Sequence, residues 1–114
     1  MANSISPMSG VEEVIQTNAT TGNGVVLAIP NSFRRHNVTI KGSAGVSAGA
    51  VQLEASNQYD FAGTWAPIAG SPVSVGDNTE LQIAFEGVYN FIRARVSTTI
   101  VGGTVTVSYL GGKA

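Results

Sequence analysis

Apolar and polar residues alternate along most of this chain, most clearly near its end. Two segments alternate: Thr104–Leu110 (TVTVSYL), and Val88–Val96, in which every second residue of 92–96 (IRARV) is apolar. A period of two is the signature of a half-buried β-strand. Arg93 and Arg95 identify the wet face of the earlier segment, because an unpaired guanidinium is costly to bury. The Gly102-Gly103 turn lies between the two segments, which are therefore predicted to form a C-terminal antiparallel hairpin with one apolar and one wet side.

Similar patterns recur upstream. Further short strands are predicted at Val11–Gln16, Val25–Ile29, Asn37–Lys41, Ala50–Ser56, Thr64–Ile68, Ser71–Val75 and Thr79–Phe85. Val11–Gln16 also fits one helical turn, but a turn-forming sequence (TNATTGNG) follows at once and favours a strand. Val25–Ile29 is apolar throughout, which indicates a strand buried on both faces or one that faces a partner subunit. Pro67 restricts its strand to a sheet edge or a bulge.

Seven to nine short strands without a long helix predict an all-β fold, an antiparallel β-sandwich that is jelly-roll or Greek-key-like. Residues 11–114 are expected to form this single domain. Residues 1–10 are expected to form an extended N-terminal arm, because Pro7 and Gly10 oppose regular structure. Ile5 and Met8 favour an arm that lies on a partner, and a frayed terminus is the alternative.

Charge is scarce in this sequence. Charged residues make up 11% of the chain, against about 25% in ordinary soluble domains. A surface with so little charge favours self-association, unless Ser, Thr, Asn and Gly hydrate it sufficiently. The net charge of −1 offers no basic surface for nucleic acid. No segment has the length of a membrane span or the pattern of a signal peptide, so a cytoplasmic chain without a membrane partner is expected.

The sequence contains little that suggests catalysis. His36 is the only histidine and has no carboxylate near it in sequence, so it is expected to be a surface or hydrogen-bonded residue and not a general base. Cysteine is absent, which excludes disulfides and thiolate metal sites. We expect no enzyme activity, catalytic residue, metal or cofactor.

The carboxylates give the same expectation. Asp60, Asp77 and Glu80 lack the spacing of a calcium loop. Glu54 and Glu86, like Glu80, are predicted on solvent faces, where they form no catalytic pair.

Two further groups of residues bear on binding. Tyr59, Phe61 and Trp65 lie within seven residues of one another, as in a sugar-binding platform, but Trp65 is expected in the sandwich core. Arg34 and Arg35 form the one local pair of cations. They could bind a partner carboxylate bidentately or be a solvated loop.

Four segments together resemble a known family. They are HNVTIKGSAGVSAGAVQLEAS (36–56), GTWAPIAG (63–70), EGVYNFIRARVS (86–97) and GGTVTVSYLGG (102–112). The pattern is similar to that of small β-sandwich virion proteins of tailed bacteriophages. It extends from residue 36 onward, about two-thirds of the chain, and its motifs are structural.

The resemblance implies a structural virion component, in first place a capsid decoration (cement) protein that binds and stabilises the phage head. The alternative is a tail, neck or head-fibre component that contacts the host surface or a carbohydrate. A free carbohydrate-binding module is a further reading. The expected partners are copies of this chain, with a trimer favoured, and the major capsid protein or another virion protein. The expected location is the virion, after assembly in the host cytoplasm. Candidate contact residues are Ile5, Pro7 and Met8 in the arm, with Arg34 and Arg35.

Overall fold

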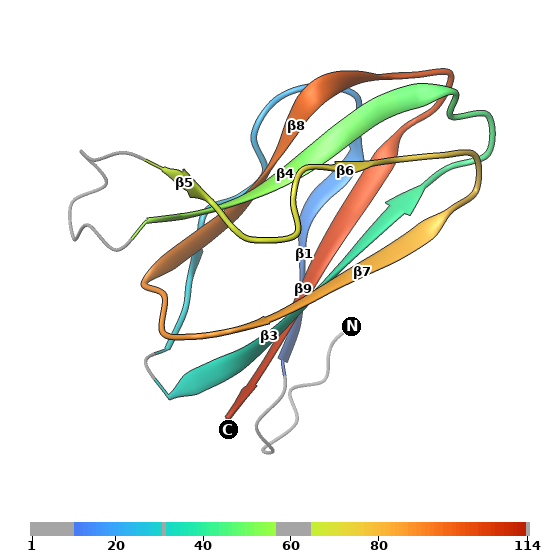
Figure 1. Ribbon diagram of the computed structural model, residues 1–114. Coiled ribbons are helices and arrows are strands. Elements are labelled where there is room, and N and C mark those ends of the chain that lie inside the picture. Colours follow the sequence, from blue (N-terminus) through green and yellow to red (C-terminus); the bar gives the residue numbers. More distant parts are fainter. Residues whose placement is uncertain (1–10, 31, 57–64, 114) are drawn as a thin grey trace.

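The computed structural model describes residues 11–30, 32–56 and 65–113, which form two antiparallel sheets packed face to face (Figure 1). The strands are β1 Val11–Ala19, β2 Leu27–Ala28, β3 Phe33–Gly42, β4 Ala48–Ser56, β5 Ala66–Pro67, β6 Val73–Ser74, β7 Glu80–Glu86, β8 Phe91–Val101 and β9 Val105–Lys113. The predicted all-β sandwich is therefore confirmed. The described residues contain no helix that could cross a membrane. The predicted arm, residues 1–10, lies outside the described residues.

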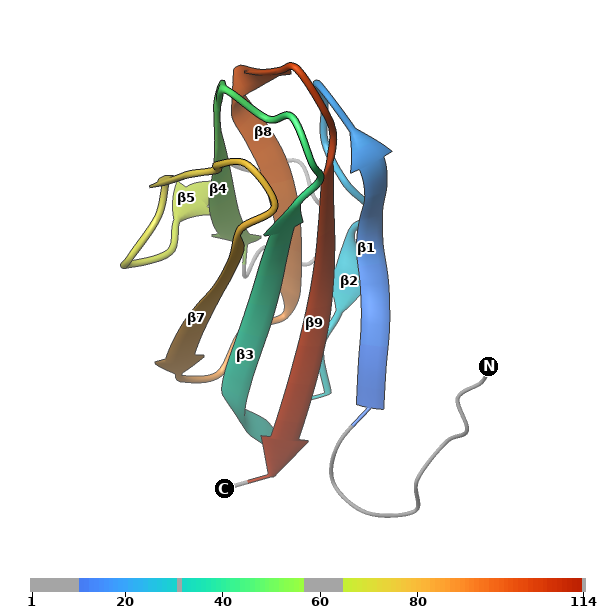
Figure 2. The same ribbon diagram turned by 90° about the vertical axis from the view of Figure 1, so that its right-hand side faces the viewer.

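The two sheets are built from strands that are mostly not consecutive in sequence. One sheet has the order β1-β9-β3-β7, and the other has the order β2-β8-β4-β5, with β6 also paired to β4. Figure 2 shows β1, β9, β3 and β7 side by side as one layer. From β1 to β4, and again from β7 to β9, each strand lies in the opposite sheet from the one before it. The chain therefore passes repeatedly from one layer to the other.

Alternation along the strands fills the space between the layers. Val38 and Ile40 of β3 point inward, and Leu53 of β4 and Ile92 of β8 meet them from the other sheet; all four are fully buried. Burial of such a side chain contributes about 1.5–3 kcal/mol. The remaining fully buried large side chains are Ile15, Val51, Val105 and Val107. Alternation in the sequence predicts Leu53, Ile83, Ile92, Val105 and Val107 as inward residues, and all five are buried.

The predicted C-terminal hairpin is wrong. β8 pairs with β2 and β4, whereas β9 pairs with β1 and β3 in the other sheet. The turn between them packs on residues 43–47, where Ser43 N–H donates to Thr104 O (2.9 Å) and Ser47 N–H donates to Val101 O (2.8 Å). Alternation correctly predicted which face of each strand is apolar. Those two faces meet across the core, and alternation does not determine which strands are neighbours.

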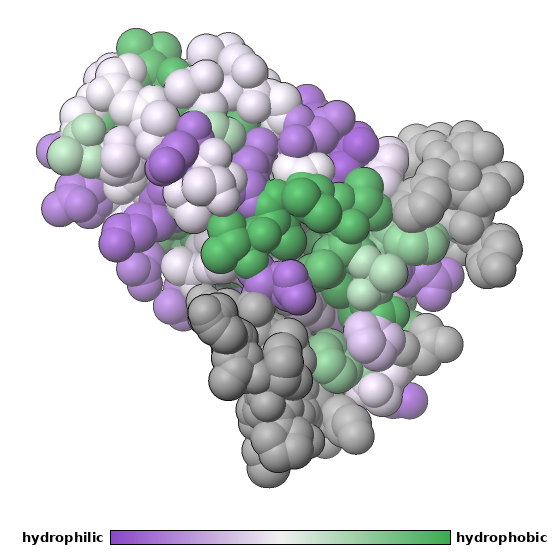
Figure 3. Space-filling model, turned by 180° about the vertical axis from the view of Figure 1, so that it is seen from behind, coloured by the Kyte–Doolittle hydropathy of each residue, from purple (hydrophilic) through white to green (hydrophobic). Residues whose placement is uncertain are grey.

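The apolar run at 25–29 also differs from one prediction. Only Leu27 and Ala28 are paired as a strand, and Val25 and Val26 are 63% and 39% exposed. The segment instead passes between the layers: Gly24 N–H donates to Ala94 O of β8, and Val25 N–H donates to Ile15 O of β1. The prediction of a strand buried on both faces is therefore wrong. Figure 3 shows an apolar area on this side of the molecule, seen from behind.

Two predictions about edges and strand ends are resolved. Pro67 lies in β5, at the edge of its sheet, as predicted. The strand predicted at Asn37–Lys41 starts earlier than expected, because β3 begins at Phe33. Arg34 and Arg35 therefore belong to a strand and not to a loop.

Candidate interaction site

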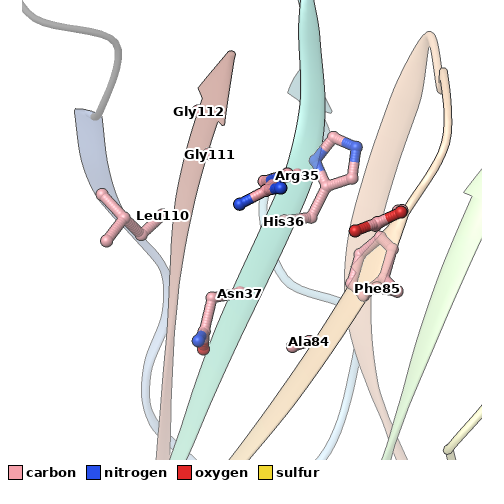
Figure 4. Close-up of a pocket in the computed structure, with 9 residues that line it drawn as sticks. Arg35, His36, Asn37, Ala84, Phe85, Leu110, Gly111 and Gly112 are labelled. Carbon is pink, nitrogen blue, oxygen red and sulfur yellow. The ribbon is translucent and has the colours of Figure 1, made fainter. Parts of the chain in front are cut away.

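A hollow of about 540 Å³ opens on the outer face of the four-stranded sheet, at the end where β3 begins. It is lined by Arg35 and Asn37 from β3 and Leu110 from β9, all labelled in Figure 4, and also by Glu86 from β7. Arg35 and Glu86 are register partners on adjacent strands. The hollow therefore presents both signs of charge beside an exposed leucine, a combination suited to side chains of another protein.

Arg34 lines a second hollow next to the first. This one measures about 450 Å³ and shares Arg35 and Glu86 with its neighbour, and Gly87 and Val88 complete its wall. Both arginines are exposed. The structure thus brings the two predicted cations together at one end of the sheet and adds Glu86, which sequence reasoning had assigned only to a solvated face.

Gly111, one of the residues that line the first hollow, leaves space on the inner side of the sheet. A Cβ on Gly111 would collide with the hydroxyl of Tyr109 and with the ring of Phe33. Without that Cβ, the buried Tyr109 hydroxyl donates to Nδ1 of His36 at 2.6 Å. Burial raises the pKa of Tyr109 to about 12, so the hydroxyl keeps its proton at physiological pH.

His36 is not a surface residue: it is 3% exposed. Its Nε2 lies 2.8 Å from the carbonyl oxygen of Gly87. A carbonyl only accepts, so Nε2 carries a proton, and in the neutral imidazole Nδ1 is then the acceptor for Tyr109. The imidazole also stacks on Phe85 and meets the edge of Tyr89. Both ring nitrogens are engaged, so the hydrogen-bonded alternative is confirmed. The surface alternative is wrong because β3 turns this position inward.

The outer face of the five-stranded sheet holds an ion cluster that sequence reasoning missed. Glu54 was predicted on a solvent face, but it is 4% exposed. Its two oxygens accept hydrogen bonds from Nε of Arg93 and Nε of Arg95, both at 2.9 Å, and from the Gln52 amide at 2.7 Å. The Glu54 prediction was wrong because the register of β4 with β8 places two arginines around this carboxylate.

Burial alone would raise the pKa of Glu54. The hydrogen bonds from Arg95, Arg93 and Gln52 outweigh that effect, so its pKa lies below the ordinary value of 4.5. The carboxylate is thus held ionised and fully used inside the cluster. A general acid needs a raised pKa and access to substrate, and Glu54 has neither.

Trp65 belongs to the same cluster and not to the core. The guanidinium carbon of Arg93 lies 4.3 Å from the centre of its ring, and the indole is only partly buried. Its predicted core position is therefore wrong. Tyr59 and Phe61, the other members of the predicted aromatic group, lie outside the described residues.

The remaining predicted ligands are dispersed or undescribed. Asp77 accepts a hydrogen bond from Gly45 N–H at 2.7 Å within a turn, and Asp60 is not described. Within residues 11–30, 32–56 and 65–113, no three His, Cys, Asp or Glu side chains are grouped as a metal site would require. Ile5, Pro7 and Met8 lie outside the described residues.

Comparison with known proteins gives a fold relationship. The chain matches no protein-family model and no curated protein by sequence. The crystal structure of the SPBc2 prophage-derived protein YomS is similar over 96% of this chain and 98% of that one, with a TM-score of 0.64 and 17% identity. A structure described as "Bacillus endospore appendages form a novel family of disulfide-linked pili" aligns with 100% of this chain and 97% of that one, with a TM-score of 0.46 and 10% identity. The first similarity shows that this chain shares its fold with a prophage-derived protein.

Proposed function

We propose that this chain is a non-enzymatic structural protein of a bacteriophage particle, and specifically a capsid decoration (cement) protein. The observation that supports this most is the whole-length similarity of its fold to the prophage-derived YomS. The resemblance of residues 36–112 to small sandwich proteins of tailed-phage virions supports it independently. The engaged state of His36 and Glu54 fits a protein without a catalytic role.

The strand order supports a capsid-associated role further. If β5 and β6 count as one strand, because both pair with β4, the chain has eight strands that wrap across two four-stranded layers. We interpret this wrap as a jelly roll, an architecture that recurs in viral capsid domains. Fold alone does not determine function, so the proposal depends on the location of the protein in the particle.

Copies of this chain are proposed to associate in the particle, as a trimer in the first instance. The apolar area around Val25 and Val26 is the proposed contact, since exposed apolar patches mark interaction sites. Val14 of β1 is 56% exposed, and its neighbour Ile15 is hydrogen-bonded to Val25, so it extends this area. Arg34, near the start of β3, is exposed and is the proposed contact with the major capsid protein.

The experiment is to locate and count the protein in purified particles. We expect it on the head, in a fixed ratio to the major capsid protein, by quantitative mass spectrometry and by labelled electron microscopy. A fixed ratio to tail proteins, with label on the tail or neck, would favour the alternative of a tail, neck or head-fibre component. Absence from washed particles would contradict a virion role altogether.

Deletion of residues 2–10 tests the arm. We expect the thermal transition of the remaining domain to stay within a few degrees, and the copies retained on particles to fall sharply. The reason is that an extended segment can pair with a neighbour's sheet edge through main-chain hydrogen bonds. Equal retention of the truncated and intact proteins would show that the arm is not a docking element.

A further inference from the structure

The outer face of the β3–β7 strand pair has an uncharged centre and two charged ends. The side chains of β3 alternate between buried His36, Val38 and Ile40 and the outward residues between them. At one end Arg35 lies opposite Glu86, and at the other end Lys41 lies opposite Glu80. These four side chains are exposed.

The centre of this face is made of short neutral side chains. Asn37 lies opposite Ala84, and Thr39 lies opposite Gln82. A centre depleted in charge and a polar rim are features of protein interfaces. The face has this arrangement along the strand direction, with a cation on β3 and an anion on β7 at both ends.

The four end charges have no ion-pair partner among the described residues. Across that part of the molecule, the ion pairs within 4 Å are those of Glu54 with Arg93 and Arg95. Arg35 and Glu86 are direct neighbours in register and still do not pair, and neither do Lys41 and Glu80. Two cations and two anions are therefore available to a partner.

We propose that this face binds the same face of a second copy of the chain, about a two-fold axis that runs parallel to the strands and between β3 and β7. That rotation lays β3 of each copy over β7 of the other. Arg35 then faces Glu86 of the second copy, and Lys41 faces Glu80 of the second copy, twice each by symmetry. Sheet faces pack about 10 Å apart, a gap that long charged side chains can span.

The charges also reject the opposite orientation. A two-fold axis in the same plane but across the strands would lay Arg35 over Lys41 and Glu86 over Glu80. Like charges in contact disfavour an orientation strongly, so the arrangement selects one of the two. This contact uses a different surface from Val25 and Val26, and it does not depend on the virion role proposed above.

The contact is small, because it involves eight outward residues from each copy. Interfaces of this size are weak between free proteins. They become effective where copies are held close together, since the effective concentration is then high. We therefore expect measurable association in solution only at high protein concentration and low salt, and weaker association as salt screens the four ion pairs.

Charge reversal with mixing tests the proposal. Arg35→Glu places two pairs of facing carboxylates in the self-contact, and Glu86→Arg places two pairs of facing guanidinium groups there. By sedimentation equilibrium at up to about 1 mM protein, where weak contacts of this size associate, each variant alone should self-associate about tenfold less than the wild type. A 1:1 mixture of the two should recover the wild-type association, because the carboxylate at position 35 of one variant then faces the guanidinium at position 86 of the other.

The mixture separates contacts between copies from effects within one chain, since neither variant regains its own cross-strand pair. Thr98→Arg mixed with Thr99→Glu is the control, because both positions are exposed on β8 away from this face. That mixture should gain nothing. Far-UV circular dichroism and the thermal transition establish that every variant is folded. The proposal is overturned if the wild type stays monomeric over this range. It is also overturned if the Arg35→Glu and Glu86→Arg mixture gains nothing, or if the control pair gains as much.

Discussion

The charged side chains on the outer faces of the two sheets differ in whether they are paired. On the five-stranded sheet, Glu54 is nearly buried and shared by Arg93 and Arg95, whose side chains are 18% and 37% exposed. On the four-stranded sheet, Arg35 and Glu86 stand opposite each other and form no ion pair with each other within 4 Å. The charges on the first face are paired within the chain, whereas Arg35 and Glu86 on the second face are exposed and are unpaired among the described residues.

The difference shows how a chain with few charges uses them. Removing one partner of a buried, hydrogen-bonded ion pair is costly, because an uncompensated charge remains. Exposed charges contribute little to stability, but they determine which surfaces associate and in which orientation. Substitutions on the two faces should therefore separate stability from association.

The largest expected effect is on the five-stranded face. Glu54→Gln retains the shape of the side chain but has one acceptor oxygen in place of two, so it cannot accept from both arginines and from Gln52. We expect a loss of about 2–4 kcal/mol in the free energy of unfolding, reduced from the fully buried case because Arg95 is partly solvated. Urea unfolding at pH 7 measures it.

The matched substitution on the other face is Glu86→Gln, which should change the unfolding free energy by less than about 0.5 kcal/mol. The dependence of stability on pH in the acid range is a second check on Glu54. Because the pKa of Glu54 is lowered, its contribution is present above 4.5 and is lost as the pH falls below that value. Equal effects of the two substitutions would contradict the contrast between the faces.

A smaller loss is expected beneath the open face. His36→Ala leaves the Tyr109 hydroxyl and the Gly87 carbonyl without their partner, and removes a ring that packs on Phe85. We expect about 1–3 kcal/mol of destabilisation, measured by urea unfolding. Thr98→Ala, at an exposed strand position, should cost almost nothing. An unchanged free energy of unfolding for His36→Ala would mean that water replaces both hydrogen bonds.

A further effect concerns stability at alkaline pH. The pKa of Tyr109 is raised from 10.0 to about 12, so the folded state holds this proton more tightly than the unfolded state. Its contribution is complete below pH 10 and is lost between pH 10 and 12, by up to about 3 kcal/mol. Thermal unfolding across that range should show a shallower decline for Tyr109→Phe than for the wild type. If the stabilities of the wild type and Tyr109→Phe fall in parallel between pH 10 and 12, groups other than Tyr109 cause the loss of stability.

Much of the fold could be predicted from the sequence, and the errors have one physical origin. Alternation identified the strands and the inward residues Leu53, Ile92 and Val107, because side-chain direction is a local property of a strand. Which strands pair is not a local property of the sequence, so the predicted hairpin of β8 with β9 was wrong. The same limit concealed the candidate sites. Glu54 meets its arginines only through the register of β4 with β8, and Arg35 meets Glu86 only through that of β3 with β7.

The two sheets also end differently at their edges. The five-stranded sheet ends in β2 and β5, each of two residues, and one residue of β5 is Pro67, which has no N–H to donate. The four-stranded sheet ends in β1, of nine residues, and β7, of seven. Long unpaired strand edges are templates for another strand, and very short ones are not. Strand addition is therefore favoured at the four-stranded sheet, and chiefly at β7, because Val25 N–H already donates to Ile15 O on the β1 edge.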